Sequence, residues 1–226
     1  MLTKLIVGAG IALGLASFTV AGASAAPLAV SSYSMANGGT GAYNYQDFSY
    51  TPCPGGDCII TGAPLSGGVG KLTDGVSPTG NWYAYGDATP WVGWYSGYPG
   101  GADPTVTFNF AGSQNIDSVT VWVDNSLGAG GVSLPDSVVI DGVSHSIAPD
   151  YGDGAPRGYT FSGLGLSGSS VDIQFNQGAT PWIMVGEVSF DGNGAVPEPA
   201  TWAMMLMGIG GLGMALRSRR QAAATA

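Results

Sequence analysis

Aromatic side chains gather in one short stretch of the sequence, residues 82–98. Seven of its seventeen residues are Trp or Tyr, whereas aromatic residues make up 10% of the whole chain. Glycine, proline and aspartate are interspersed among them, which is typical of a loop. Flat apolar rings with polar tips can stack on sugar rings and hydrogen-bond sugar hydroxyls. The stretch predicts either a glycan-binding platform or a small core that covers one end of the fold, and the candidate platform residues are Trp91, Trp94, Tyr95 and Tyr98.

Two cysteines, Cys53 and Cys58, bracket a turn sequence, residues 54–57. In an oxidising compartment, thiols separated by so short a turn favour a local disulfide. A metal site is disfavoured, because the only histidine is far away in the sequence and no further cysteine completes a tetrahedral set. We expect the disulfide to rigidify a surface loop and to contribute on the order of 2 kcal/mol to stability.

The sequence lacks the common catalytic motifs. It contains no Gly-x-Ser-x-Gly elbow, no His-Glu-x-x-His pair and no phosphate-binding loop. His145 lies in a segment typical of a hairpin, where a solvent-facing or hydrogen-bonded role is expected. Glycoside hydrolysis needs two carboxylates at a set separation, and the acidic residues of this chain supply carboxylates without fixing their placement. We predict a protein that is not an enzyme.

Short strands must position these residues. Three segments alternate apolar and polar side chains with a period of two, which is typical of half-buried strands; they are residues 105–110, 119–124 and 171–175. Further candidate strands are residues 29–35, 44–50, 137–140, 144–147, 158–161 and 182–190. Asp141-Gly142 lies between two apolar runs and predicts a hairpin. Since no part of the middle of the chain shows a helical period, we predict a single all-β domain, an antiparallel β-sandwich.

Charge excludes one class of partner. The chain has 6 Lys and Arg against 15 Asp and Glu, and residues 26–196 contain fourteen of the acids and two of the bases. Binding to nucleic acid through its phosphates requires the opposite sign, so we expect no nucleic-acid partner. An anionic polysaccharide would also be repelled unless calcium bridges the two surfaces.

Residues 1–25 are typical of a secretory signal peptide. Lys4 supplies a positive start, residues 5–20 form an apolar run, and Ala23-Ser24-Ala25 offers the small-x-small pattern of a cleavage site. We predict a signal helix that is cleaved after Ala25. A retained membrane anchor is the alternative, and the short apolar run disfavours it.

A second apolar stretch, residues 200–216, lies near the C-terminus. Its 17 residues would form a helix of about 26 Å, slightly shorter than a hydrocarbon core of about 30 Å. Trp202 would lie at one interface, and three arginines at the other would place the C-terminus in the cytoplasm; they are Arg217, Arg219 and Arg220. A short transmembrane helix is predicted, with a helix buried in a soluble domain as the alternative.

The same region resembles a known sorting signal. Pro197-Glu198-Pro199, an aromatic residue at Trp202, a Gly-rich apolar stretch and a closing Arg cluster follow one another in residues 196–220. This order resembles the PEP-CTERM sorting signal of exported proteins in Gram-negative bacteria. The resemblance implies that an exosortase, a membrane-embedded cysteine protease, recognises the motif and releases or transfers the protein toward the surface. It further implies an association with exopolysaccharide, and it concerns delivery rather than activity.

A second resemblance covers residues 71–192. Leu72-Thr73-Asp74-Gly75, a downstream Trp82, the run 103–110 and the segment 186–192 look like the galactose-binding-like jelly roll of discoidin domains and many carbohydrate-binding modules. The resemblance implies that Trp82 is packed inside and that a structural calcium ion is bound between the Asp-Gly loop and the last strand. The implied ligands are side-chain oxygens of Asp74, Thr79 and Glu187 and backbone carbonyls of Lys71, Val76 and Gly186.

Strand geometry supports part of this calcium site. If residues 182–190 form one regular strand, Glu187 shares a face with Ile183 and Val185, and its carboxylate points toward a largely apolar side. An unpaired buried charge is costly or forces protonation. Calcium would remove the conflict, because it accepts six to eight oxygen ligands in irregular geometry. The alternative is a β-bulge near Gly186 that turns Glu187 toward water.

These observations predict an exported β-sandwich of the jelly-roll type. The expected organisation is a signal peptide, a sandwich domain, a sorting signal with its transmembrane helix and a cytoplasmic tail, at residues 1–25, 26–195, 196–220 and 221–226. We expect the domain to bind an extracellular polysaccharide without catalysis, at the envelope or in the extracellular matrix. The expected partners in delivery are an exosortase-type protease and the inner membrane. The alternative is a structural surface or biofilm-matrix protein without a glycan ligand.

Overall fold

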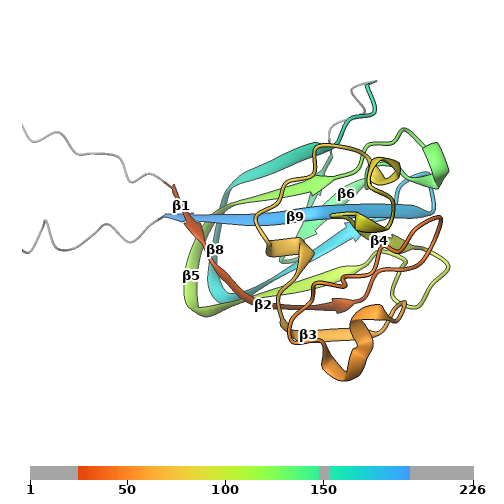
Figure 1. Cartoon of the computed structure of the whole chain (residues 1–226). Coiled ribbons are helices and arrows are strands. Elements are labelled where there is room, and N and C mark those ends of the chain that lie inside the picture. Colours follow the sequence, from red (N-terminus) through yellow and green to blue (C-terminus); the bar gives the residue numbers. More distant parts are fainter. Residues whose placement is uncertain (1–24, 148–152, 194–226) are drawn as a thin grey trace, which may run out of the picture.

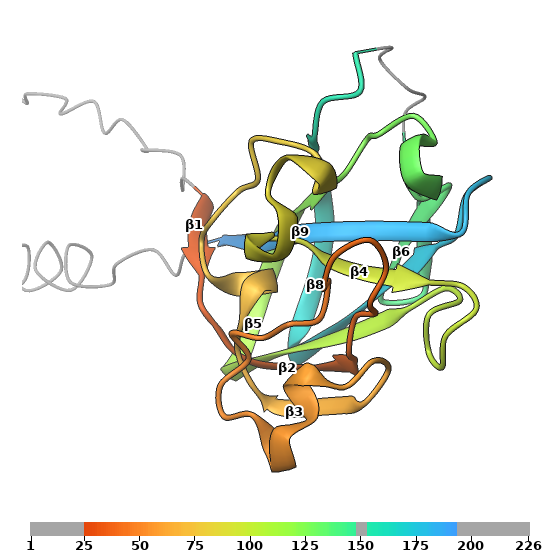
Figure 2. The same cartoon turned by 45° about the vertical axis from the view of Figure 1, so that its right-hand side comes forward.

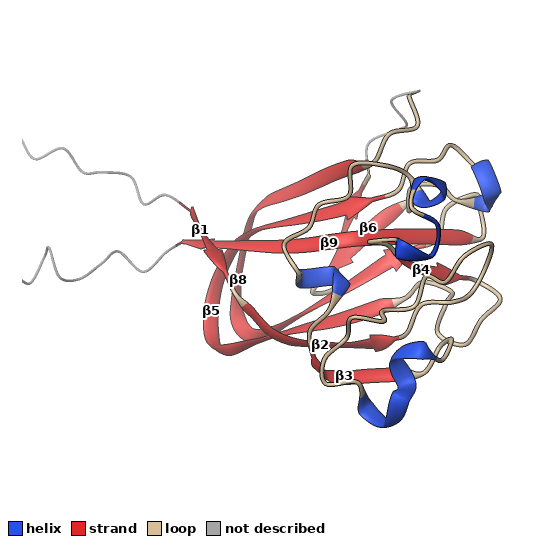
Figure 3. Ribbon diagram, viewed as in Figure 1, coloured by secondary structure: helices blue, strands red, loops and turns tan. Residues whose placement is uncertain are grey.

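The computed structural model describes residues 25–147 and 153–193, which form a curled antiparallel sheet with a few short 3₁₀ helices (Figures 1 and 3). The strands are β1 (Ala25–Leu28), β2 (Val30–Ala36), β3 (Pro64–Gly68), β4 (Val92–Tyr95), β5 (Thr105–Val123), β6 (Ser137–Ile140), β7 (Val143–Ser146), β8 (Arg157–Asn176) and β9 (Trp182–Asn193). The 3₁₀ helices are η1 (Pro54–Ile59), η2 (Lys71–Thr73), η3 (Trp82–Ala84), η4 (Gly86–Ala88) and η5 (Ala129–Gly131). Most of the expected signal peptide and the whole sorting region lie outside the described residues.

Two long strands, β5 and β8, fold the sheet into two layers. They pair with each other along most of their length, and the register shifts between Asn109 and Gln114 and again between Ile116 and Ser118. Such bulges bend a sheet. Gly163 and Gly165 of β8 adopt φ of 70° and 59° in the same region, which residues with a side chain rarely adopt. Each strand therefore runs through one layer, bends, and returns through the other.

The remaining strands extend these two layers. β2 pairs with the first half of β5 and with β3, while β6 pairs with the second half of β8 and with β7. In the other layer β9 pairs with the second half of β5 on one side, and with β4 and β1 on the other. The arrangement is consistent with a β-sandwich, as the sequence predicts.

The core lies between the layers and is rich in aromatic and β-branched side chains. Phe108 of one layer meets Phe190 of the other edge to face at 5.1 Å between ring centroids, and Phe110 packs on the same Phe190 ring at 5.2 Å. Valines of β5 that alternate in the sequence, Val119 and Val121, are fully buried. The period-two pattern therefore marked the buried face correctly.

The two-residue hairpin between β6 and β7 is present as predicted. Asp141 and Gly142 have φ of 47° and 83°, the left-handed pair that a type I′ turn requires. The disulfide between Cys53 and Cys58 is also present, with Cα atoms 5.5 Å apart, and it closes the loop that contains η1. Within the described parts of the chain, no helix is long and apolar enough to cross a bilayer.

Some strand predictions are wrong. Residues 44–50 form no strand. Asp47 is buried there, its backbone N–H donates to the side chain of Asn37, and its carboxylate accepts hydrogen bonds from Tyr33 and from the backbone N–H of Lys71. β1, β3 and β4 were not predicted. β4 lies inside the aromatic stretch that the sequence favours as a loop, and it forms because residues 92–95 pair in register with residues 182–185 of β9.

Candidate functional site

The aromatic stretch is mainly a core and not an exposed platform. Trp91 and Trp94 are 0% and 1% exposed, so neither indole can stack on a sugar. Trp94 stacks on Phe175 at 6.0 Å and donates its Nε1–H to the carbonyl of Ala36 at 2.8 Å. The Trp91 Nε1–H donates to the carbonyl of Gly80 at 3.2 Å. The platform prediction is therefore wrong for these two tryptophans, and the alternative of a small core holds for them.

The other two platform residues remain near the surface. Tyr95 is half-buried and Tyr98 is 36% exposed. Their rings contact each other at 5.2 Å between centroids, and both contact Trp182 at the start of β9, at 5.2 Å and 6.2 Å. The Tyr98 hydroxyl donates to the carbonyl of Thr40. We call these three side chains, Tyr95, Tyr98 and Trp182, the aromatic rim.

Trp82 is half-buried in a second, smaller core that forms around Tyr45, Trp91, Val132 and Met184. Its backbone N–H donates to a carboxylate oxygen of Asp124 at 2.6 Å, and the hydroxyl of Ser126 donates to the same carboxylate. Burial raises the pKa of Asp124 to about 6. Asp124 thus fastens the segment that carries Trp82 to the end of β5.

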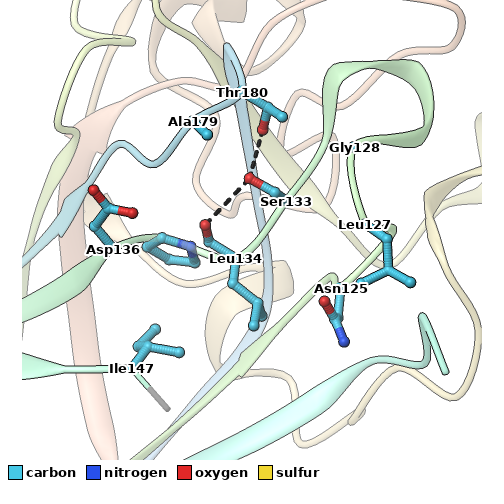
Figure 4. A pocket seen from close by; sticks show the side chains of 10 residues that line it. Asn125, Leu127, Gly128, Ser133, Leu134, Asp136, Ile147, Ala179 and Thr180 are labelled. Atoms are coloured by element: carbon cyan, nitrogen blue, oxygen red, sulfur yellow. Dashed lines mark hydrogen bonds between the residues drawn. The ribbon is translucent and has the colours of Figure 1, made fainter. Parts of the chain in front are cut away.

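A cavity of about 370 Å³ opens beside this second core. Three segments that are distant in the sequence form it: the β5–β6 connection, the residue after β7, and the β8–β9 connection (Figure 4). Its lining residues are Asn125, Leu127, Gly128, Ser133, Leu134, Pro135, Asp136, Ile147, Ala179 and Thr180. The lining combines hydroxyl, amide and carboxylate groups with aliphatic side chains.

Leu127, which lines this cavity, has a strained backbone conformation. Leu127 has φ of 54°, a left-handed conformation that residues with branched, bulky side chains rarely adopt, and it is followed by Gly128 at φ of 87°. Leu127 is nevertheless 47% exposed. Figure 4 shows its side chain among those that line the cavity. Strain of this kind clusters at binding sites, so the cavity is a candidate site on backbone geometry as well as on shape.

The polar groups of the cavity are fixed by close packing between its walls. The hydroxyls of Ser133 and Thr180 hydrogen-bond each other at 2.6 Å (Figure 4). A side chain at Gly178 would bring its Cβ within 2.8 Å of the Leu134 carbonyl and 3.1 Å of a carboxylate oxygen of Asp136. The β8–β9 connection therefore depends on glycine at this position to lie against the opposite wall.

The structure brings together two of the predicted calcium ligands, Asp74 and Glu187. Their carboxyl groups share a hydrogen bond, and the backbone N–H of Gly75 donates to Oε2 of Glu187 at 3.2 Å. Burial and the neighbouring charge of Asp74 raise the pKa of Glu187 to about 7, and burial raises the pKa of Asp74. Burial and mutual repulsion disfavour the ionised form of both carboxyl groups. A hard cation bound between them would offset this cost, because it is coordinated by carboxylate oxygens.

Glu187 is buried although the strand is irregular. The pairing of β9 with β5 shifts register between Trp122 and Val123, which leaves Gly186 as an extra residue. The β-bulge near Gly186 that the sequence offered as an alternative is thus present. It does not turn the Glu187 side chain toward water, because Glu187 is 6% exposed. Gly186 is needed there because a Cβ would lie 2.1 Å from the Pro78 ring.

Three of the other predicted calcium ligands have contacts of their own. The Thr79 hydroxyl lies 3.2 Å from the Tyr85 hydroxyl, and Val76 follows Asp74 in the same turn and donates its N–H to Oδ1 of Asp74. Lys71 is 8% exposed and its Nζ donates to the carbonyl of Gln46, while burial lowers its pKa to about 8. Among the described residues, no three His, Cys, Asp or Glu side chains gather around one point. Carboxylate ligands at Asp74 and Glu187 would thus need carbonyl and water oxygens to complete a shell.

His145 plays no part in the cavity. It lies on β7 and contacts the ring of Phe161 at 5.1 Å, and it is not among the lining residues.

Comparison with known proteins identifies the C-terminal region. Residues 195–220 match the PEP-CTERM protein-sorting motif. The motif covers the region that the sequence predicts as a sorting signal, and it implies an exported, membrane-anchored precursor that is destined for the cell surface and is processed by an exosortase. No curated protein matches the chain.

Solved structures similar to the domain include proteins that bind carbohydrate. The family 32 carbohydrate-binding module of NanJ from C. perfringens, solved with galactose, is 13% identical, with a TM-score of 0.31 over 53% of this chain and 88% of that one. A fucolectin from striped bass, Morone saxatilis, is 11% identical, with a TM-score of 0.32 over 74% and 78%. Truncated AlyQ, which has a family 32 carbohydrate-binding module and an alginate lyase domain, is 12% identical, with a TM-score of 0.33 over 54% of this chain and 28% of that one.

Proposed function

We propose that the exported domain binds a carbohydrate without catalysis, in the cavity between the β5–β6 and β8–β9 connections. The observation that carries the proposal is the mixed lining of a cavity of about 370 Å³, large enough for a small ligand. A sugar ring has an apolar face and polar hydroxyls. Leu127 and Ile147 offer apolar contacts, while Ser133, Asp136 and Thr180 offer hydrogen-bonding groups.

The charge of the lining points to a neutral or amino sugar. Among the described residues that line the cavity, Asp136 is charged and none is Lys or Arg. A carboxylate accepts hydrogen bonds from neighbouring hydroxyls and attracts an ammonium group, but it repels the carboxylate of a uronic acid. The aromatic rim is linked to the cavity, because Ser96, which follows Tyr95, donates its N–H to the carbonyl of Pro181 in the β8–β9 connection. We therefore place a terminal sugar in the cavity and a following unit on the rim.

Glycan binding can be tested on the purified domain by glycan array and calorimetry against the polysaccharides of the producing organism. We expect binding of neutral glycans that falls at least tenfold in Asp136→Asn, because the anionic acceptor is lost. Asp141→Asn is a matched control: it removes the same charge from an exposed hairpin, where asparagine suits the turn equally well. Equal affinities in the two variants, or no glycan bound by the native domain, would argue against the proposal.

We also propose a structural calcium ion at the Asp74–Glu187 pair. Its role would be to neutralise two buried carboxyl groups and so to join the loop after η2 to β9. Binding at a calcium concentration one hundred times the dissociation constant would stabilise the fold by about 2.7 kcal/mol. The thermal unfolding temperature is therefore expected to rise with calcium and to fall with a chelator, and Glu187→Gln should abolish the response. An unfolding temperature that calcium leaves unchanged would contradict the site.

A structural surface or matrix protein without a glycan ligand is the second candidate. The burial of Trp91 and Trp94 favours it, because the aromatic stretch that could have formed a sugar platform is used for packing. The glycan array separates the two candidates directly. In both cases we propose delivery through the inner membrane, anchoring by the C-terminal segment and processing by an exosortase-type protease.

A further inference from the structure

The first and the last strand of the described domain lie side by side. β1 is antiparallel to the end of β9, and the register aligns Ala25 with Asn193 and Ala26 with Gly192. Both strands leave the sheet at the same end of the molecule, as the two views in Figures 1 and 2 show. The sorting motif begins at residue 195, two residues after the strand. The anchor region therefore follows directly from this end.

The link between this end and the bilayer is short. Seven residue steps separate Asn193 from Ala200, where the apolar stretch of the motif begins. Even a fully extended chain of this length spans only about 24 Å. In the anchored precursor, the end of β9 thus lies within this distance of the membrane surface.

The cavity lies at the opposite end of the same strand. Ala179 and Thr180 line the cavity and precede β9, whereas the anchor region follows β9. A strand of 12 residues extends over about 36 Å. The length of β9 therefore separates the cavity from the point at which the chain is attached to the membrane. The orientation of β9 relative to the bilayer consequently decides which way the mouth of the cavity faces.

The end from which the chain leaves carries few charges. It comprises the ends of β1 and β9 and the bends of β5 and β8 at residues 111–115 and 162–170, which we call the closed end. No Lys, Arg, Asp or Glu occurs in residues 25–36, 108–116 or 162–171, and the bends expose mainly glycine and serine. Two acids lie at this end: Asp191 of β9, which pairs with Pro27 of β1, and Asp117, in the register shift of β5. Elsewhere the domain is strongly acidic, and acidic groups are repelled by the anionic surface of a bilayer.

We propose that the closed end is a membrane-facing surface. In the anchored precursor it rests on the lipid surface from which the sorting motif emerges, so that the cavity and the aromatic rim face away from the membrane. Three observations agree on this orientation: the paired termini, the short link and the uncharged bends of β5 and β8. The inference rests on the sorting motif and does not depend on whether the cavity binds a glycan.

The test uses the full-length chain, expressed without an exosortase and exposed on spheroplasts. Single cysteines replace two small, exposed residues, Ser113 in the closed end and Ala102 at the opposite end; the native cysteines are joined in a disulfide. The probe is a bulky, membrane-impermeant polyethylene glycol maleimide. A second pair of variants carries twenty Gly and Ser residues inserted after Asn193, a linker with a root-mean-square length of about 25 Å.

We expect Ser113→Cys to react several-fold more slowly than Ala102→Cys in the native chain, because the bilayer blocks the bulky reagent. The inserted linker should bring the two rates together. Equal reaction rates without the linker would overturn the proposal, because the closed end would then be as accessible to the reagent as the opposite end of the domain. A slow Ser113→Cys reaction that persists with the linker would also overturn it, because the protection would then come from the protein itself.

Discussion

The two ends of the sandwich are built by opposite means. At the loop end, formed by residues 95–104, 124–136 and 177–181, connections of irregular backbone surround a cavity, and two residues other than glycine, Asp103 and Leu127, adopt positive φ. At the closed end, long strands bend without interruption, and glycine and serine line the surface. Backbone strain of this kind clusters at ligand-binding and switch regions. The contrast agrees with the proposed division of roles, in which the loop end binds a glycan and the closed end faces the membrane.

The largest expected effect tests whether the aromatic stretch at the loop end is a core. Trp94→Ala removes a fully buried indole that stacks on Phe175 and donates a hydrogen bond to Ala36. We expect the free energy of unfolding, measured with urea, to fall by about 3–5 kcal/mol. A loss below about 1 kcal/mol would be typical of a surface ring and would restore the platform interpretation.

The next effect concerns the buried acid that fastens Trp82 to the loop end. The pKa of Asp124 is raised to about 6 in the fold, so between pH 4 and pH 6 the folded state binds more protons than the unfolded state. The Asp124 contribution to stability is therefore present below pH 4 and is lost as the pH rises to 6, by up to roughly 3 kcal/mol.

Asp124→Asn isolates this contribution, because asparagine keeps an oxygen acceptor but does not titrate. We expect the free energy of unfolding of the native chain to fall relative to that of the variant as the pH rises from 4 to 6.5. A difference between the two proteins that stays constant across this range would show that Asp124 does not titrate as described.

A smaller effect tests the strain at Leu127. Leu127→Gly removes the side chain that opposes positive φ, so the free energy of unfolding should stay constant or rise by up to about 1 kcal/mol. The same change removes an exposed apolar contact from the cavity. We expect weaker glycan binding together with unchanged or higher stability, measured by calorimetry and by urea unfolding. A clear loss of stability would mean that Leu127 serves packing.

The smallest effect is expected at the closed end. Ser113→Asp places a charge on an exposed bend and should change the free energy of unfolding by less than about 0.5 kcal/mol. The same substitution should weaken the contact of the domain with anionic lipid vesicles when the full chain is anchored in them. Ala102→Asp is the matched control and is expected to change neither quantity.

Local sequence patterns predict an element well where residues adjacent in the sequence determine its structure. The alternation in residues 105–110 and 119–123, the Asp141-Gly142 turn and the disulfide between Cys53 and Cys58 depend on adjacent residues, and all were predicted. β4 was missed because its pairing partner in β9 is about ninety residues away, and glycine and tyrosine around it suggested a loop. The 44–50 prediction failed because Tyr45, Gln46 and Asp47 are all buried in succession, and Asp47 bonds to side chains and loops far away in the sequence.

The candidate site was harder to predict than the fold. The meeting of Asp74 and Glu187 followed from a resemblance that specified both positions, and the aromatic stretch drew attention to the correct end of the molecule. The cavity itself is formed by residues such as Leu127, Asp136 and Thr180, which lie in three separate connections. Leu127 before Gly128 offered a local sign, but no sequence pattern reports a backbone angle at leucine.

The pairing of β1 with β9 also sets the order in which the molecule can be completed. The two strands are 168 positions apart at Ala25 and Asn193, and β9 lies between β5 and the two short strands β1 and β4. The sheet consequently stays open until nearly the whole polypeptide has been synthesised, and contacts of such long range form slowly. A chain that completes its sheet late stays unfolded for longer, a property that is compatible with export of the protein toward the cell surface.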